Sequence, residues 1–326
     1  MKALTFAAGL FTASTALAQT PVLTVYAPDY FTSDWGPGPA IEAAFEAQCG
    51  CDLQFKPGDL LPRLLLEGNR TEADVVIGLN TDVTKKARDS GLFAPHGQDT
   101  GALTLPIDWT DDVFLPFDWS YVSFVYDTTR LDTPPTSFEA LAAAPDDLKV
   151  IIQDPRSSIS GLALVLWVKA VYGDRSEEIW AGVAPHILTV TKGWSEAYGL
   201  FTDGEAPMVL SFTTSPAYHI AAEGDDTKKA AIFDEGHYAF FELVAKVAGT
   251  DQPELADAFM AFVLSDTFQK IIPETNWSYP SALPKADWPQ VFQDLPAPAK
   301  AIFLDEDQSA ALRDEAIEEW RRALSQ

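Results

Sequence analysis

The chain alternates apolar strands with helices from residue 22 onward, and this order restricts the folds open to it. Residues 22–26, 53–55 and 73–78 are β-branched or apolar runs, and helical patterns over 41–45 and 60–67 separate them. The same order returns over 149–172 and again over 189–219. Strands that alternate with helices form parallel sheets whose faces the helices cover. We therefore predict an α/β fold with parallel-rich sheets.

Two lobes are expected, because 326 residues exceed the usual size of one domain. The run 114–126 is too long and too aromatic for an ordinary core strand, and it predicts a strand that crosses between the lobes. A second crossing is expected after the turn at 234–236. These crossings predict a first lobe formed by 19–115 and 236–283, and a second lobe formed by 116–235 and 284–326.

The first eighteen residues have the pattern of a cleaved signal peptide. Lys2 supplies the positive start, residues 4–17 are the apolar middle, and Ala16-Leu17-Ala18 is a cleavage site of small residues. No later stretch approaches twenty apolar residues. We therefore expect an exported, soluble, periplasmic protein, and we expect it to be a monomer.

Charge and cysteine content exclude several classes of function. The formal net charge is −26, which disfavours binding to nucleic acid or to anionic membranes. The chain has two cysteines, Cys49 and Cys51, and an oxidising compartment favours a local disulfide between them over a metal or redox site.

Common catalytic patterns are absent from the sequence. No G-x-S-x-G, H-E-x-x-H or P-loop pattern occurs, and the four histidines lack metal-ligand spacing. His219 is expected to be a packed, hydrogen-bonded histidine. We therefore predict no catalytic residues, no metal and no cofactor.

Aromatic residues divide between packing and a ligand site. Trp167, Trp180 and Trp320 occupy predicted helix faces and are expected to pack in cores. Three other tryptophans stand beside Gly, Pro or Asn in predicted loops, which favours a cleft: Trp35, Trp194 and Trp277.

Two loops are expected at the same end of neighbouring parallel strands, where open α/β sheets bind ligands. One loop supplies the indole of Trp194. The other supplies Thr213, Thr214, Ser215 and Tyr218 at a predicted helix start with outward-facing amides. Aromatic faces beside a helix start suit a ligand that is flat and cationic at one end and rich in oxygen at the other.

Two further polar positions have alternative interpretations. Ser158 lies in the hydroxyl-rich loop 154–161, which either holds an anion or caps the following helix. Asp59 lies at a strand-to-helix junction, where it either caps the helix or faces the cleft.

Several motifs then carry a resemblance that spans the chain after the signal. D-W-G-P-G-P at 34–39, K-G-W-S-E-A-Y-G-L-F at 192–201, T-T-S-P-A-Y-H at 213–219 and N-W-x-Y-P at 276–280 occur in this order. Together they resemble the periplasmic thiamine-binding proteins of bacterial ABC importers. The resemblance implies a two-lobed periplasmic binding protein of type II, with thiamine or its phosphates enclosed between the lobes and delivered to an inner-membrane permease.

The resemblance also implies roles for single residues. Asp59 matches an acid that contacts the aminopyrimidine, Ser158 a serine on the phosphate side, and Trp35 the tryptophan of the family's D-W-G-P loop. Trp194, Tyr218 and Trp277 match pocket aromatics. Pro28 and Phe212 stand where the family has tyrosines, so phosphorylated forms are expected to bind less favourably here. The predicted ligand-binding residues are Trp35, Asp59, Ser158, Trp194, Phe212, Ser215, Tyr218 and Trp277.

Alternatives remain at this point. Another organic cation, such as a polyamine, would need the acidic and aromatic residues but no phosphate-side serines. A secreted thiamine-degrading enzyme on the same fold would need a cysteine nucleophile in the cleft. Ferric iron is disfavoured, because that relative presents adjacent tyrosines and Tyr218 has none beside it.

Overall fold

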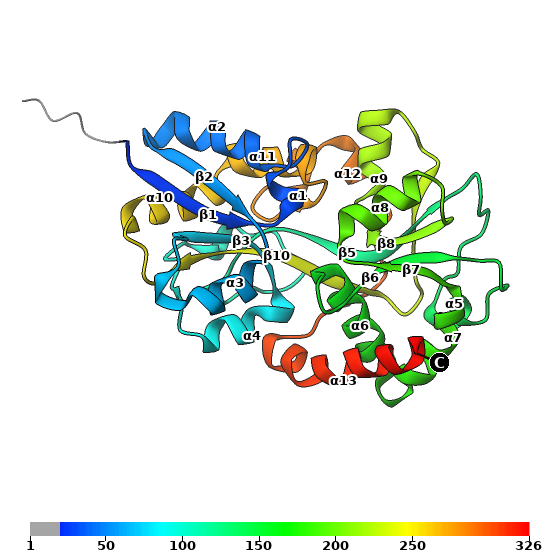
Figure 1. Ribbon diagram of the computed structural model, residues 1–326. Coiled ribbons are helices and arrows are strands. Elements are labelled where there is room, and N and C mark those ends of the chain that lie inside the picture. The colour runs from blue at the N-terminus through cyan, green and yellow to red at the C-terminus, as the bar shows by residue number, and fades with distance from the viewer. Residues whose placement is uncertain (1–19, 326) are drawn as a thin grey trace, which may run out of the picture.

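A computed structural model describes residues 20–325 and shows a mixed sheet flanked by helices (Figure 1). The predicted signal peptide lies outside these residues. The sheet order is β2-β1-β3-β10-β5-β8-β6-β7, with four short strands attached to β5 and β10. No helix within residues 20–325 has the length and apolar character to cross a membrane.

Parallel strands form each half of the sheet, and two long antiparallel strands join the halves. The first lobe is built around β1–β3 and the second around β6–β8. The strands are β1 Val22–Ala27, β2 Asp52–Pro57, β3 Val75–Asn80, β4 Phe93–Ala94, β5 Leu115–Asp127, β6 Val150–Gln153, β7 Ile187–Thr191, β8 Met208–Phe212, β9 Lys228–Ala231, β10 His237–Val247, β11 Tyr279–Pro280 and β12 Ala301–Ile302.

Helices follow most parallel strands, as the sequence order predicts. The helices are α1 Asp29–Thr32, α2 Gly38–Cys49, α3 Leu60–Glu67, α4 Thr81–Asp89, α5 Phe138–Ala142, α6 Ile159–Tyr172, α7 Ser176–Val183, α8 Trp194–Thr202, α9 Pro216–Tyr218, α10 Pro253–Val263, α11 Asp266–Thr275, α12 Gln290–Gln293 and α13 Glu306–Leu324.

The predicted crossing strand is confirmed as β5. Its first part pairs with β10, and its second part pairs with β8 and β9 in the other half of the sheet. β10 runs back and pairs with β3 of the first lobe. Strands β5 and β10 therefore connect the lobes, and the fold is that of a two-lobed α/β protein.

Each lobe has its own apolar clusters on both faces of its sheet. In the first lobe one cluster contains Phe45 and Phe259, and a second contains Leu64 and Phe241. In the second lobe α6 is buried along most of its length. The three tryptophans predicted to pack are all buried, which confirms that prediction: Trp167, Trp180 and Trp320.

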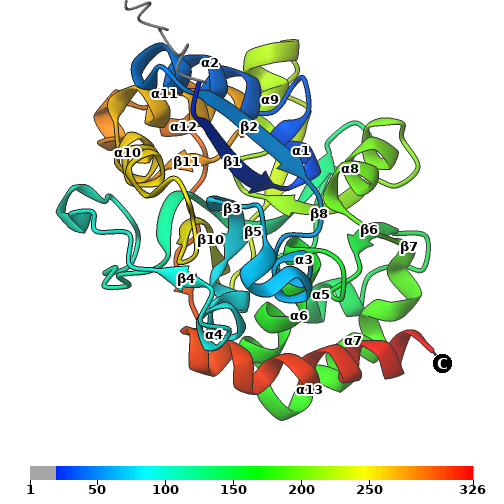
Figure 2. The same ribbon diagram turned by 60° about the vertical axis from the view of Figure 1, so that its left-hand side comes forward.

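Helix α13 lies along both lobes, next to α4 and α6 (Figures 1 and 2). At its N-terminal end Glu306 pairs with Arg88 of α4 at 3.0 Å. Nearer its C-terminal end Glu319 pairs with the buried Lys169 of α6 at 2.7 Å. The helix therefore links the two lobes through ion pairs on one side of the molecule.

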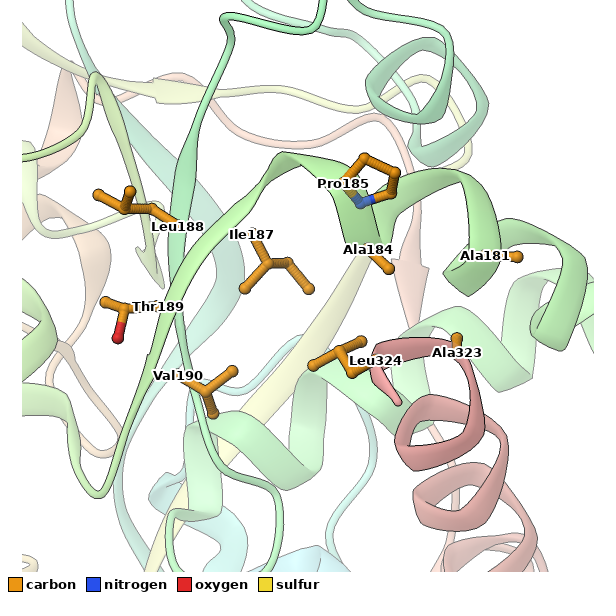
Figure 3. A pocket seen from close by; sticks show the side chains of 9 residues that line it. All are labelled: Ala181, Ala184, Pro185, Ile187, Leu188, Thr189, Val190, Ala323 and Leu324. Atoms are coloured by element: carbon orange, nitrogen blue, oxygen red, sulfur yellow. The ribbon is translucent and has the colours of Figure 1, made fainter. Parts of the chain in front are cut away.

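A pocket of about 440 Å³ lies where β7 and the end of α7 meet the C-terminus of α13 (Figure 3). Most of its lining is aliphatic, including Ile187, Val190 and Leu324. A second pocket of about 260 Å³ lies beside β5 and is lined by Trp119, Tyr279 and other residues.

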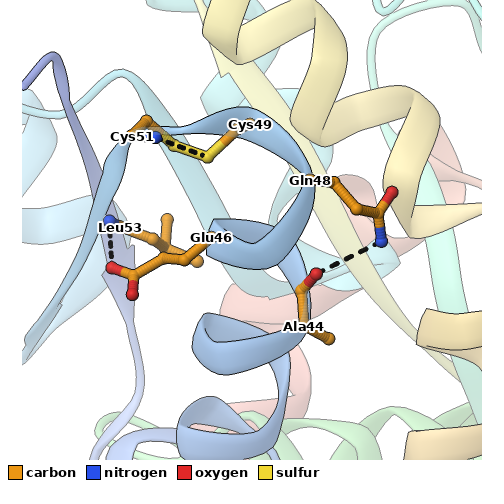
Figure 4. The surroundings of a disulfide bond; sticks show 6 residues. All are labelled: Ala44, Glu46, Gln48, Cys49, Cys51 and Leu53. Atoms are coloured by element: carbon orange, nitrogen blue, oxygen red, sulfur yellow. Dashed lines mark hydrogen bonds between the residues drawn. A yellow bond between two sulfur atoms is a disulfide. The ribbon is translucent and has the colours of Figure 1, made fainter.

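The expected local disulfide joins Cys49 at the end of α2 to Cys51 just before β2 (Figure 4). Gly50 between them has φ 63°, a left-handed conformation that glycine adopts at low cost. Nearby, the carboxylate of Glu46 accepts a hydrogen bond from the amide of Leu53 at 2.9 Å, so this corner is also held by a polar contact.

Candidate ligand-binding site

Most of the predicted ligand residues follow the carboxyl ends of parallel strands. Trp194 comes after β7, Ser215 after β8, Ser158 after β6 and Asp59 after β2. We expected β7 and β8 to be neighbouring strands, and this was wrong, because β6 lies between them. Both strands are parallel to β6, so their loops still share one edge of the sheet.

Aromatic rings from both lobes are in contact at this edge. Trp35 of the first lobe lies with its ring centroid 6.5 Å from that of Trp194 in the second. Trp277, which follows α11 of the first lobe, lies 5.3 Å from Tyr218 in the second. Trp35 is 56% exposed, so much of its indole surface remains available to a ligand.

Two further rings connect these contacts within the second lobe. Tyr198 stacks on Trp194 at 4.8 Å with an interplanar angle of 23°, and it also stacks on His219 at 5.8 Å. His219 in turn lies 5.0 Å from Tyr218. The sequence placed Tyr198 on the same helix as Trp194, but it gave no signal that Tyr198 links the two loops.

Hydrogen bonds fix the orientation of these rings. The Trp194 indole donates to Ser211 Oγ at 2.8 Å, and Ser211 and Ser215 share a hydrogen bond of 2.7 Å. Tyr198 and His219 Nε2 are 2.9 Å apart. Burial raises the pKa of Tyr198 well above its ordinary value, so its hydroxyl keeps its proton.

His219 is buried and hydrogen-bonded through both ring nitrogens, which confirms the expectation of a packed histidine. Its Nδ1 is 2.7 Å from Glu223, and the side chains of His219, Glu223 and Asp225 have potential ligand atoms within 4.8 Å of one another. Within residues 20–325 this group has the side-chain types that bind metal ions. Both nitrogens of His219 already form hydrogen bonds, one with Glu223 and one with Tyr198.

The predicted helix start after β8 differs from expectation. Helix α9 has three residues, Pro216–Tyr218, and a π-helical turn, His219–Glu223, follows it. The amide of Thr213 donates to the carbonyl of Tyr121 at 2.9 Å, and the amide of Ser215 donates to the carbonyl of Phe212 at 3.1 Å. These amides are therefore not outward-facing, which corrects the prediction of free donors.

The remaining predicted residues take different places. Ser158 caps α6, since its hydroxyl accepts from the Gly161 amide at 3.4 Å, and it also bonds Ser160 at 2.8 Å. Asp59 is exposed at the start of α3, and its side chain makes no capping hydrogen bond. Phe212 is half-buried with its ring 5.0 Å from Phe240. None of the predicted ligand residues lines either of the two pockets described above.

A buried polar cluster near Trp277 was missed at the sequence level. We call it the acid quartet: Tyr30, Asp118, Glu242 and Asn276. Tyr30 donates its hydroxyl to Glu242, and the Asn276 amide donates to Asp118 at 2.5 Å and to Glu242 at 2.9 Å. The available signal was an acidic residue among the apolar and aromatic residues of each of two long strands, β5 and β10.

Comparison with known proteins places this geometry among binding proteins. A sequence profile described as bacterial extracellular solute-binding protein matches residues 71–311. The chain is 47% identical over 309 residues to a thiamine-binding periplasmic protein of Escherichia coli (strain K12), covering 94% of each chain. It is 44% identical over 307 residues to the protein of that name from Brucella abortus, covering 93% of this chain and 92% of the relative.

Solved structures agree with the sequence matches. A periplasmic thiamin binding protein superimposes with a TM-score of 0.92 and 45% identity, covering 98% of this chain and all of the other. Iron-bound HitA from Pseudomonas aeruginosa superimposes with a TM-score of 0.76 at 21% identity, over 93% of this chain and 99% of that one, and it shares the fold.

Proposed function

The chain belongs to the family of bacterial extracellular solute-binding proteins, and from this we propose that it binds thiamine between its two lobes and delivers it to the permease of an ABC importer. The observation that carries the proposal is the pair of ring contacts between the lobes, Trp35 with Trp194 and Tyr218 with Trp277. These rings stand in a chain that is 44–47% identical, over nearly its whole length, to proteins named for thiamine binding.

The chemistry of thiamine suits this set of rings. Its thiazolium carries a permanent positive charge, and its aminopyrimidine is flat. A tryptophan or tyrosine face attracts such a cation by about 0.5–2 kcal/mol, and more where water is excluded. Trp35, Trp194, Tyr218 and Trp277 supply these faces from both lobes, so the ligand itself would hold the lobes together.

The eight residues named from the sequence remain our proposed ligand contacts, and the lobe boundaries remain our proposed domain division. Ser158 and Ser215 are proposed to lie toward a phosphate group when a thiamine phosphate is bound. We also propose that residues 1–18 direct export and are removed, and that the mature protein is a periplasmic monomer. Mass spectrometry of the exported protein tests the cleavage, and sedimentation tests the monomer.

A binding role without catalysis is proposed because the required nucleophile is lacking. Both cysteines of the chain, Cys49 and Cys51, are joined in a disulfide. Cys51 precedes β2, at the end of that strand opposite to Asp59. A thiamine-degrading enzyme would need a free thiol among the aromatic residues.

Calorimetry and thermal shift with thiamine, its monophosphate and diphosphate, putrescine and spermidine test the proposal. We expect saturable binding of thiamine at a ratio of one, with no stabilisation by the polyamines. Thiamine should be recovered intact after prolonged incubation with the protein. Binding of a polyamine in place of thiamine, or breakdown of thiamine, would overturn the proposed function.

A further inference from the structure

The acid quartet brings together side chains from four separate segments of the chain. Tyr30 belongs to α1, Asp118 to β5, Glu242 to β10, and Asn276 follows α11. Asp118 and Glu242 face each other in the register of the two crossing strands. The two residues are 1% and 6% exposed, and both carboxyl groups accept a hydrogen bond from the same nitrogen, Asn276 Nδ2.

The quartet lies beside the place where rings of the two lobes meet. Asn276 directly precedes Trp277, whose ring contacts Tyr218 of the second lobe. Ser120 lies on the same face of β5 as Asp118, because side chains alternate along a strand. Ser120 Oγ is 3.0 Å from Thr214 Oγ1 in the loop after β8. Asp118 is therefore two residues from a contact with the loop after β8, and its partner Asn276 is one residue from the ring that contacts Tyr218.

The backbone at Trp277 adds a second sign of a specialised site. Trp277 has φ 54°, and among residues 20–325 it is the non-glycine residue in the left-handed region. A bulky residue adopts this conformation at a cost, and such residues cluster at ligand clamps. Asn276, held by both carboxyl groups of the quartet, fixes the chain just before this turn.

The charge of the quartet is not balanced within the protein. Asp118 and Glu242 make no ion pair or hydrogen bond with a lysine, arginine or histidine in residues 20–325; their partners are the phenol of Tyr30 and the amide of Asn276. One oxygen of Asp118, Oδ1, is buried and accepts no hydrogen bond. Two adjacent buried carboxylates repel each other, so the pair needs either a proton or a cation.

Burial and the neighbouring charge of Glu242 raise the pKa of Asp118 well above its ordinary value. Burial likewise raises the pKa of Glu242, against the hydrogen bonds it accepts from Tyr30 and Asn276. The two carboxyl groups influence each other's titration, so together they keep one proton to a higher pH than an ordinary carboxyl group does.

We propose that Asp118 and Glu242 are the counter-charge for the ligand's fixed positive charge, and that the pair holds one proton without ligand and releases it when the cation binds. This inference rests on the proposed function, because it requires an organic cation between the lobes. The released proton passes to the buffer, since a thiazolium nitrogen carries none to exchange. Tyr30 and Asn276 are positioning residues, which keep the two carboxyl groups oriented in both states.

The test is calorimetry of thiamine binding in PIPES and in ACES, whose ionisation enthalpies differ, between pH 5.5 and 8.5. The comparison ligand is the neutral isostere in which a thiophene replaces the thiazolium. For thiamine we expect up to one proton released, and an affinity that rises by up to tenfold per pH unit while the pair is protonated. The isostere shares the aminopyrimidine, so its smaller or absent proton release isolates the effect of the fixed charge.

Variants assign the released proton to this pair. Asp118→Asn and Glu242→Gln should each abolish the pH dependence and weaken thiamine binding at least tenfold more than isostere binding. Asp82→Asn is the matched control, because Asp82 is also buried with a raised pKa but is bonded to Tyr238 of β10 and Ser309 of α13. That variant should keep the proton release.

Each outcome decides a separate question. If thiamine fails to bind, the proposed function is wrong. If thiamine binds with the same heat in both buffers at every pH, or if the isostere releases the same number of protons, the inference is wrong and the proposed function stands. The wild-type comparison needs no substitution, so it decides the inference even where a variant does not fold.

Discussion

Replacing Trp35 with alanine should weaken thiamine binding while leaving the fold almost unchanged. Trp35 is 56% exposed, and the aromatic ring in contact with it is Trp194 of the other lobe, at 6.5 Å. Truncating an exposed side chain usually changes the free energy of unfolding by about 0.5 kcal/mol or less. Losing one cation–π face costs about 0.5–2 kcal/mol of binding free energy, which corresponds to a factor of about 2–30 in Kd.

Trp194→Ala should have a larger effect on both quantities. This substitution removes the indole that donates to Ser211 at 2.8 Å and stacks on Tyr198 at 4.8 Å, so folding as well as binding loses contacts. The double variant of Trp35 and Trp194 completes a cycle. If the two rings face one ligand, their coupling in the free energy of thiamine binding exceeds their coupling in the free energy of unfolding, which reports only their contact with each other.

The assay is calorimetry with thiamine, paired with urea denaturation of the ligand-free protein. Leu66→Ala is the matched control, because Leu66 is 83% exposed on α3 and has no place in the proposed site. That variant should change neither quantity. The reasoning fails if Trp35→Ala changes Kd by less than twofold, or if it destabilises the ligand-free protein by more than about 1 kcal/mol.

Four further predictions follow from other contacts. Glu319→Ala should destabilise the protein by about 3 kcal/mol in urea denaturation, because it removes the buried carboxylate that pairs with the buried Lys169. Glu315→Ala removes the exposed partner of the same lysine and should cost less than about 1 kcal/mol. Burial raises the pKa of Asp82 from 3.8 to about 6, so the folded state binds the proton of Asp82 more tightly than the unfolded state does. The free energy of unfolding should therefore fall by about 3 kcal/mol as pH rises from about 4 through about 6. Asp82→Asn should remove that part of the pH profile. Replacing both cysteines with serine opens a very short loop and should cost about 2 kcal/mol or less of unfolding free energy, with thiamine affinity unchanged by calorimetry. Thiamine monophosphate and diphosphate should bind more weakly than thiamine in calorimetry, because Pro28 and Phe212 offer no hydroxyl groups. Equal or tighter binding of the phosphates would refute this.

Features that depend on local pattern could be predicted from the sequence. The alternation of strands and helices, the crossing strand β5 and the packed tryptophans each follow from hydrophobic periodicity or from residue type. The loop positions of Trp35, Trp194 and Trp277 could also be predicted, because these residues stand beside glycine, proline or asparagine. Such loops lie at the edges of a sheet, where rings from different segments can meet.

Features that depend on how distant segments pack could not be predicted. The acid quartet combines residues 30, 118, 242 and 276, which stand far apart in the chain and share no motif. Chain order likewise does not place β6 between β7 and β8. The hydroxyls before α9 indicated a helix start, but Ser215 bonds Ser211 and the amide of Phe212 instead. Such local side-chain bonds compete with regular helix formation.

The balance of energies between the lobes explains how a small ligand can control their closure. The contacts of Trp35 with Trp194 and of Tyr218 with Trp277 are two aromatic pairs between the lobes. Together they supply about 1–3 kcal/mol. A ligand bound with a micromolar Kd supplies about 8 kcal/mol.

Since the cluster around Trp167 and the cluster around Phe45 share no residue, opening the lobes would leave most of both clusters buried. Helix α13 and strands β5 and β10 hold the lobes together on the other side of these rings, so rotation about the crossing strands is the motion that remains. A ligand that touches rings of both lobes therefore outweighs the direct contacts between the lobes. The same comparison predicts that the thiophene isostere, which lacks the charge, closes a smaller fraction of molecules than thiamine does at equal concentration, as small-angle scattering would measure.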